Sequence, residues 1–221
     1  MIQLPDFEAS FEYENNFYLS CSPNRIAKVL AHYELYKMVK DLPGQVVECG
    51  VFKGASFSRF AMFRELFETP YSKKLIGFDT FGKFPETEFP QDKIPRERFI
   101  ESAGDKSISM KQLGMVLEYK GIKSNVELVP GNILETVPKY LYEHPELKIS
   151  LLNLDTDVYE PAVVILEHLF PRLVKGGVLI IDDYGVFPGE TKAVDEYFQN
   201  SPFDIKKFSY CMTPCFVIKT E

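Results

Sequence analysis

Four aspartates follow two apolar segments of the chain, at the points where those segments end. Asp155 and Asp157 lie in the stretch LLNLDTDVYE, and Asp182 and Asp183 lie in GGVLIIDDYG. Carboxylates held close together repel one another and raise each other's pKa, so such a cluster lowers stability unless a cation, a proton or hydrogen-bond donors compensate it. The four residues therefore predict a site for a positively charged ligand.

The segments that must position these aspartates alternate between strand-like and helix-like patterns. Short, nearly continuous apolar strands are expected in QVVECG, KLIGFDTF, NVELVPGN, ISLLNLDTD and VLIIDD, and helical patterns lie between them. This alternation is typical of a parallel sheet covered by helices on both faces. FDIKKFS and CFVIKTE predict a closing antiparallel hairpin. We expect an α/β fold with a doubly wound, mostly parallel sheet and an antiparallel edge at the C-terminus.

The chain is expected to form a single domain over residues 1–221, because it contains no Ser/Gly-rich linker and no internal repeat. Residues 1–45 form an N-terminal helical segment. Residues 81–119 interrupt the strand–helix rhythm with three prolines and a late helix around Lys111 to Tyr119. An insertion of this length after a strand is more often a lid or binding loop than a packed layer.

Composition and charge restrict the class of partner. The sequence is 45% hydrophobic, as a folded globular protein is, and its net charge of -7 argues against general binding to nucleic acid or to anionic membranes. The acidic N-terminus, the lack of a membrane-length apolar segment and four cysteines without a CxxC pair predict a reduced, cytoplasmic protein. A small-molecule substrate fits this acidic composition. The sequence is also compatible with a homo-oligomer in which the partner subunit contributes to the lid.

Ligands of open α/β sheets bind outside the carboxyl ends of the strands, and the other distinctive polar residues also lie there. In ECGVFKGAS, Gly50 and Gly54 allow a tight turn and a close ligand approach, and Ser56 with the following helix amides suits a carboxylate or phosphate. Phe52 stands where the nicotinamide fingerprint requires its second glycine, which disfavours a pyrophosphate. Glu48 before the turn points instead to a ligand with a cationic amine.

Two further strand ends admit both a binding and a structural interpretation. Asp79 can accept hydrogen bonds from ribose hydroxyls, or it can form a turn with Thr80. Asn132 can present its amide to an adenine edge, or it can be part of a turn with Gly131.

These segments resemble the metal-dependent sugar O-methyltransferases related to macrocin and mycinamicin O-methyltransferases. The resemblance runs from about Val46 to the C-terminus and rests on ECGVFKGAS, IGFDTF, LNLDTDVYEPAVVILEHLFPRLVKGGVLIIDDYG and FPGETKAVDEYF. It implies a class I, Rossmann-like methyltransferase fold with S-adenosylmethionine and Mg²⁺ as cofactors. It also implies a role for each site residue. The methionine end of the cofactor would be surrounded by Glu48, Gly50, Gly54 and Ser56, the ribose would contact Asp79, and the adenine would contact Asn132. The magnesium ligands would be Asp155, Asp182 and Asp183, and the general base would be Asp157.

The chemistry of the implied reaction explains why these residue types are needed. A sugar hydroxyl is a poor nucleophile, so attack on a sulfonium methyl requires removal of its proton or polarisation of its oxygen. A hard divalent cation lowers the pKa of a bound hydroxyl, and carboxylates suit magnesium. We expect Asp155, Asp182 and Asp183 to hold the ion, two adjacent substrate hydroxyls to chelate it, and Asp157 to take the proton. The resemblance alone implies the acceptor, a deoxysugar on a nucleotide or natural-product scaffold.

Local patterns leave structural alternatives open for some of these residues. Asp157 and Glu160 have the spacing of a capping box, although Pro161 as first helical residue would leave Asp157 free. Asp182 and Asp183 can face one site only if the chain turns after them, which Tyr184-Gly185 favours. The three histidines are interpreted as surface or packing residues: His32, His144 and His168.

Three other functions compete with this hypothesis. A metal-independent small-molecule methyltransferase would use the aspartates only to bind an amine or hydroxyls. A metal-dependent phosphoester hydrolase would use the aspartates but would leave the glycine turn and Asp79 unexplained. A non-catalytic nucleoside-binding domain would retain clustered charge without a use for it.

Overall fold

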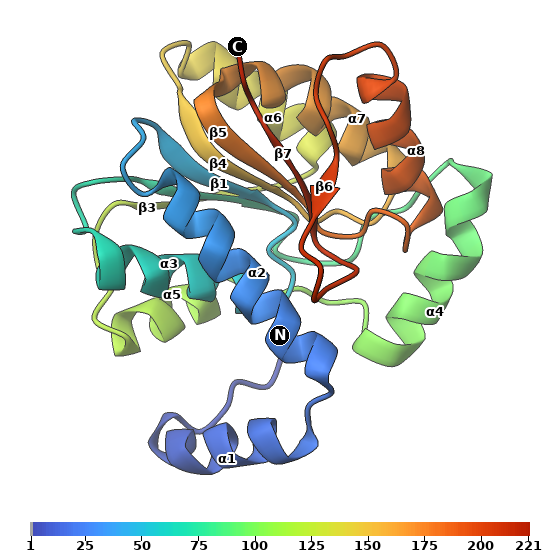
Figure 1. The fold of residues 1–221 in the computed structure, drawn as a ribbon. Helices are drawn as coiled ribbons and strands as arrows, with labels where there is room; N and C mark the ends of the chain where they lie inside the picture. Colours follow the sequence, from blue (N-terminus) through green and yellow to red (C-terminus); the bar gives the residue numbers. More distant parts are fainter. Residues whose placement is uncertain (1) are drawn as a thin grey trace.

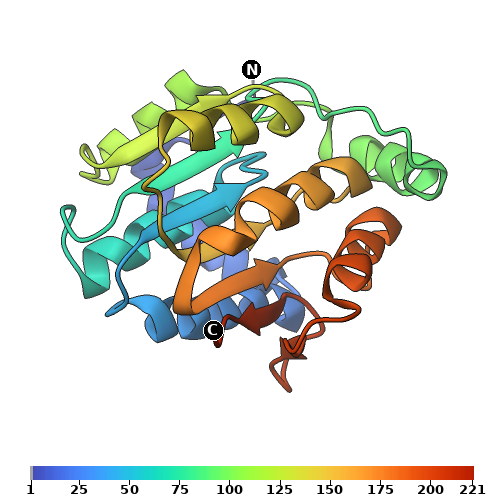
Figure 2. The ribbon, with the colours of Figure 1, turned by 90° about the horizontal axis from the view of Figure 1, so that it is seen from above.

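A twisted sheet crosses the centre of the molecule between two layers of helices (Figures 1 and 2). The structure, a computed structural model, describes residues 2–221 and contains within them seven strands in the order β3-β2-β1-β4-β5-β7-β6. β1 to β5 run parallel, whereas β7 is antiparallel to β5 and to β6. The strand bounds are β1 Gln45–Cys49, β2 Leu75–Asp79, β3 Val126–Pro130, β4 Ile149–Leu154, β5 Leu173–Ile181, β6 Lys206–Lys207 and β7 Cys215–Ile218. The expected α/β fold with its antiparallel C-terminal edge is confirmed.

Each face of the sheet has its own apolar core, because neighbouring side chains of a strand point to opposite faces. One core contains Val46 and Leu151 together with helices α2 (Pro23–Val39), α3 (Ala55–Phe67) and α5 (Met110–Tyr119). The other contains Val47 and Leu152 together with helices α6 (Ile133–Glu143), α7 (Tyr159–His168) and α8 (Pro188–Phe198). Burial on both faces is why the central strands read as continuous apolar runs.

The order of the strands creates a switch point between β1 and β4. The chain adds β2 and then β3 on one side of β1, and it returns to place β4 on the other side. Crevices at such points bind ligands in open α/β sheets. At this point the Asp155 amide donates to the Cys49 carbonyl, at 3.0 Å. Gly50 has a φ of 95°, and a Cβ on it would lie 1.6 Å from the Asp155 carbonyl oxygen. The close neighbour that requires this glycine is therefore the chain itself.

The insertion between β2 and β3 contains two helices, whereas the sequence predicted only the later one. α4 (Lys93–Ala103) precedes α5, after a single 3₁₀ turn, η2 (Pro90–Asp92). The carboxylate of Asp92 accepts the backbone N–H groups of Tyr159 and Gly189, at 2.9 and 2.7 Å. Glu160 accepts those of Glu88 and Phe89, at 2.8 and 2.9 Å. Four backbone hydrogen bonds thus fasten the insertion to α7 and α8.

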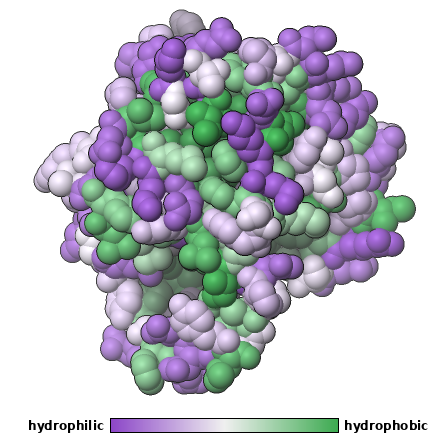
Figure 3. Space-filling view, in the orientation of Figure 1, coloured by the Kyte–Doolittle hydropathy of each residue, from purple (hydrophilic) through white to green (hydrophobic). Residues whose placement is uncertain are grey.

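The N-terminal segment has two parts with different surroundings. α2 packs on the sheet with Leu35, Tyr36 and Val39. The 3₁₀ turn η1 (Phe7–Ala9) leads into α1 (Ser10–Ser20). α1 projects from the body and contains no buried residue (Figure 1). Figure 3 shows hydrophilic and hydrophobic residues interleaved over this face, including the α1 projection at the bottom. Within residues 2–221, no helix combines the length and the apolar character that crossing a membrane requires.

The start of α7 differs from the sequence prediction. The helix begins at Tyr159 after Val158, so Pro161 is its third residue and the predicted first position is wrong. Proline remains compatible there because the first-turn N–H groups have no partner within the helix. The N-cap has no side-chain hydrogen bond, so the capping box of Asp157 and Glu160 does not form.

Candidate active site

A pocket of about 910 Å³ lies at the carboxyl ends of the parallel strands. α2 contributes Arg25 and Lys28 to its wall, and the insertion contributes aromatic residues such as Phe84 and Phe99. Most of the residues predicted from the sequence line it, namely Gly50, Ser56, Asp79, Asn132, Asp155, Asp157, Asp182 and Asp183. Glu48 and Gly54 are not among the lining residues.

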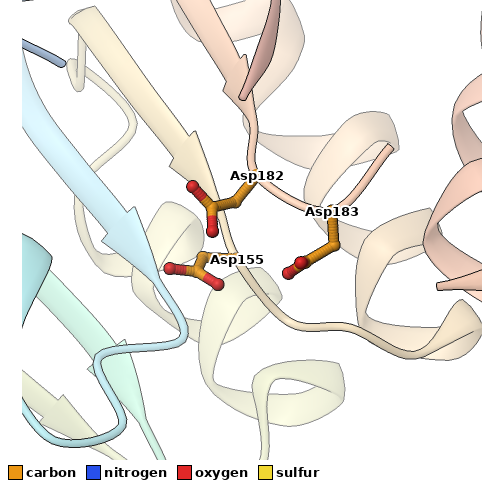
Figure 4. Close-up of side chains that lie close together, drawn as sticks. All are labelled: Asp155, Asp182 and Asp183. Atoms are coloured by element: carbon orange, nitrogen blue, oxygen red, sulfur yellow. The ribbon is translucent and has the colours of Figure 1, made fainter. Parts of the chain in front are cut away.

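Three of the four aspartates converge on one point (Figure 4). Asp155 follows β4 and Asp182 follows the adjacent β5, so the parallel strands bring their side chains together. β5 ends at Ile181 and the chain turns, which lets Asp183 face the same point. One carboxylate oxygen from each of the three lies within 4.8 Å of the others.

The electrostatics of this cluster favour a bound cation. Burial, together with the neighbouring carboxylates, raises the pKa of Asp155 and of Asp183 well above the ordinary range. Burial also acts to raise the pKa of Asp182, but Lys28 and His32 outweigh it and hold that pKa below its usual value. Within residues 2–221, the buried Oδ1 of Asp182 has no hydrogen-bond partner. An all-oxygen, carboxylate-rich set with a free acceptor fits a hard divalent ion such as Mg²⁺.

Asp157 lies beside this cluster in an unusual backbone conformation. Its φ is 64°, a left-handed value that few residues other than glycine adopt. Burial, followed by the charge of Glu190, raises its pKa to about 7, and its carboxyl group shares a hydrogen bond with that of Asp183. Strained backbone of this kind persists only where the surroundings enforce it, and it is frequent at functional sites.

Glu190, which the sequence analysis did not single out, joins the two aspartate-bearing loops. It is fully buried at the first turn of α8. Its Oε2 accepts the N–H groups of Thr156 and Asp157, both at 3.3 Å, and its Oε1 accepts the N–H of Asp183 at 2.9 Å. One carboxyl group thus fixes the position of the backbone on both sides of the cluster.

Three residues of α2 and α3 also approach the cluster and were not predicted to do so. The Lys28 ammonium forms an ion pair with Asp182 Oδ2. His32, interpreted from sequence as a packing or surface residue, is buried against Phe60 with its Nε2 3.5 Å from Asp182 Oδ1. Its Nδ1 lies 2.9 Å from an Arg59 nitrogen, and arginine only donates, so the proton of the neutral ring is on Nε2. Burial lowers the His32 pKa, which favours that neutral form.

The residues predicted for the nucleoside and methionine groups have partners within the protein. Ser56 donates from Oγ to Glu48 Oε1 at 2.6 Å, and burial raises the pKa of Glu48 to about 8. Asp79 accepts the N–H groups of Phe52 at 2.8 Å and Phe81 at 2.6 Å, two residues with φ of 45° and 48°. Its carboxylate therefore stabilises two strained turns at the pocket wall.

Asn132 and Gly54 have evident structural roles. Asn132 is the N-cap of α6, where its Oδ1 accepts the Leu134 N–H at 3.1 Å, so its side chain stabilises the start of a helix rather than a turn. Gly54 precedes α3 with a φ of 79°, and a Cβ there would lie 3.2 Å from Leu113 Cδ1. Their binding roles remain predictions.

Comparisons with known proteins agree with this architecture. Residues 24–206 match the family described as macrocin-O-methyltransferase (TylF). The chain is 33% identical over 149 residues to the 8-demethyl-8-(2,3-dimethoxy-alpha-L-rhamnosyl)-tetracenomycin-C 4'-O-methyltransferase of Streptomyces olivaceus, covering 66% of this chain and 54% of that protein. It is 28% identical over 159 residues to the mycinamicin III 3''-O-methyltransferase of Micromonospora griseorubida, covering 71% and 61%. The chain thus spans less than two thirds of the length of these curated relatives.

Solved structures of methyltransferases have the same fold as this chain. The calicheamicin methyltransferase CalS11 superimposes with a TM-score of 0.74 and 27% sequence identity, over 95% of this chain and 85% of the other. The O-methyltransferase NovP superimposes with a TM-score of 0.72 at 19% identity, over 88% and 80%, which supports the fold alone. Since the family match extends over most of the chain, the chain belongs to the macrocin-O-methyltransferase family.

Proposed function

We propose that this chain is an S-adenosylmethionine-dependent, Mg²⁺-dependent O-methyltransferase that acts on a sugar hydroxyl. The observation that carries the proposal is the meeting of Asp155, Asp182 and Asp183 in the pocket that the glycine turn after β1 also lines. Family membership supports methyl transfer, and the names of two relatives support a sugar acceptor in a natural product. A structural neighbour is named as a TDP-rhamnose 3'-O-methyltransferase, so a nucleotide-linked deoxysugar is the other acceptor class to test.

The cofactor would bind across the switch point of the sheet. Asp79, at the end of β2, retains acceptor capacity toward ribose hydroxyls besides its two backbone bonds. Glu48 has a buried Oε2 without a hydrogen-bond partner in the described chain, and the positive charge of a methionine ammonium bound there would favour its ionised form. Gly50, Ser56 and Asn132 line the same pocket. When bound, the cofactor supplies an electrophilic methyl group on sulfur.

Asp155, Asp182 and Asp183 would hold the divalent ion, which lowers the pKa of a hydroxyl that coordinates it. Asp157 would remove the proton from the acceptor oxygen. That oxygen forms the new bond to the methyl carbon as the carbon–sulfur bond breaks, and the proton remains on the Asp157 carboxylate. Burial and Glu190 raise the pKa of Asp157 to about 7, close to the value at which a base is most effective near neutral pH.

A methyl-transfer screen tests this proposal. Nucleotide-linked deoxysugars and glycosylated natural products would be incubated with S-adenosylmethionine, with Mg²⁺ or with excess chelator. We expect transfer only in the presence of the divalent ion. Undiminished transfer after confirmed metal removal would favour a metal-independent methyltransferase, and absence of S-adenosylhomocysteine binding by calorimetry would favour a hydrolase.

The substitution Asp157→Asn tests the base. The amide keeps the size of the side chain but cannot take a proton, so turnover should fall by about 10²–10⁴-fold. Binding of S-adenosylhomocysteine should be unchanged, because Asp157 has no role in holding the cofactor. Unchanged turnover would remove the assignment of Asp157 as base.

A further inference from the structure

α2 brings one positive charge into direct contact with the carboxylate cluster. Lys28, which lines the pocket, pairs through its ammonium with Asp182 Oδ2; its side chain is 26% exposed, whereas that of Asp182 is 2% exposed. Within residues 2–221, no other lysine or arginine forms an ion pair with Asp155, Asp182 or Asp183. Arg59, another cation of the pocket wall, contacts the ring of the neutral His32.

The two oxygens of Asp182 consequently differ in availability. Oδ2 is occupied by Lys28, whereas Oδ1 is buried and has no hydrogen-bond partner in the described chain. His32 Nε2 lies 3.5 Å from Oδ1, which is too far for a well-formed hydrogen bond. The pair with Lys28 therefore leaves Asp182 with a single oxygen that has no hydrogen-bond partner within residues 2–221.

The net charge of the cluster also determines which kind of ion it suits. Metal ligands must be deprotonated, so Asp155, Asp182 and Asp183 would contribute three negative charges around an ion. Lys28 compensates one of them through Asp182 and leaves two. A buried group of charges is tolerated only when it is close to neutral and well paired. One divalent ion completes this balance, whereas a trivalent ion exceeds it.

We propose that Lys28 is a positioning residue that stays paired with Asp182 when the ion binds and makes the cluster selective for divalent over trivalent ions. This inference rests on the proposed metal site. Lys28 repels a trivalent ion more strongly than a divalent one, because Coulomb energy scales with charge. A neutral residue at position 28 would remove that discrimination.

Metal affinities measured without substrate test the role of Lys28. Calorimetric titrations with Mg²⁺ and with terbium(III) would be carried out on the wild type and on Lys28→Met, and the relevant signal is the one that Asp182→Asn abolishes. We expect the preference for terbium(III) over Mg²⁺ to rise about tenfold or more in Lys28→Met. Lys28→Arg, which keeps the charge, should retain the wild-type ratio. Lys37→Met, which removes a surface pair with Glu34 and a cation–π contact with Tyr33 on the same helix, should also retain it.

Lys28→Gln provides a second neutral variant in case Lys28→Met does not fold, since an amide can still donate to Asp182. An unchanged ratio in the neutral variants, with Asp182-dependent binding intact, would overturn the role of Lys28 alone. A ratio that also rises in Lys28→Arg would overturn it too, because charge would then not be the cause. If the wild type binds neither ion at an Asp182-dependent site, the proposed metal site fails together with the inference.

Discussion

Glu190→Gln is the perturbation that most directly tests the construction of the site. The carboxyl group of Glu190 presents two oxygens, one to the N–H of Asp183 at 2.9 Å and the other to those of Thr156 and Asp157, both at 3.3 Å. Both oxygens accept hydrogen bonds whether the group is ionised or protonated. An amide of the same shape has only one accepting atom, so its NH₂ must face at least one buried N–H group.

The magnitude follows from the hydrogen bonds that the amide cannot make. A buried N–H left without an acceptor lowers stability by about 1–3 kcal/mol. We expect the free energy of unfolding to fall by about 2 kcal/mol, because one side of the bridge is lost and the two 3.3 Å bonds are long. Loss of the bonds to Thr156 and Asp157, which directly follow Asp155, should also weaken Mg²⁺ binding by about 10–100-fold, as is usual for residues that orient metal ligands.

Urea denaturation would give the free energy of unfolding, and calorimetry would give the affinity for Mg²⁺. Glu167→Gln, an exposed substitution on α7, is the matched control and should leave both quantities unchanged. A Glu190→Gln protein within about 0.5 kcal/mol of the wild type, with wild-type Mg²⁺ affinity, would show that Glu190 does not hold the two loops.

Three further substitutions have distinct expected outcomes. Gly50→Ala should lower the free energy of unfolding by more than about 2 kcal/mol in urea, because its Cβ would lie 1.6 Å from a backbone oxygen. Asp92→Asn should lower it by about 1–2 kcal/mol and speed proteolysis of the insertion, because the amide accepts on one side only. Glu48→Gln should flatten the dependence of stability on pH. Burial raises the Glu48 pKa to about 8, so the folded protein keeps this proton, whereas the unfolded chain releases it near pH 4.5. The free energy of unfolding of the wild type therefore falls between pH 4.5 and 8 by up to about 1.4 kcal/mol per pH unit.

Each of these outcomes has a control or a contradicting result. Gly104→Ala also places a side chain at positive φ, 85°, but no atom lies within 4 Å of its Cβ, so equal losses at the two glycines would exclude the clash as the cause. Proteolysis of Asp92→Asn at the wild-type rate would mean that Asp92 does not anchor the insertion. A Glu48→Gln protein with the wild-type pH slope would show that Glu48 is not the titrating group.

The sequence predicted the position of the site because its signals are local. Continuous apolar strands identify a parallel sheet, and parallel strands bring their carboxyl ends to one edge, so aspartates that follow two strands are expected to meet if the strands are adjacent. The same reasoning did not find α4, whose residues are largely exposed and have no apolar stripe. It also placed the start of α7 two residues late, since proline is tolerated throughout the first turn.

The amino-acid sequence by itself determined the fold class, the strand ends that carry the polar residues and the family. Only the tertiary structure decided how the cluster is charged and held. Lys28 and Asp182 are 154 residues apart, and Glu190 reaches back 33 and 34 residues to Asp157 and Thr156. Such contacts leave no periodic pattern in the sequence, because they depend on how α2 and α8 pack on the sheet and not on which residues neighbour them in the chain.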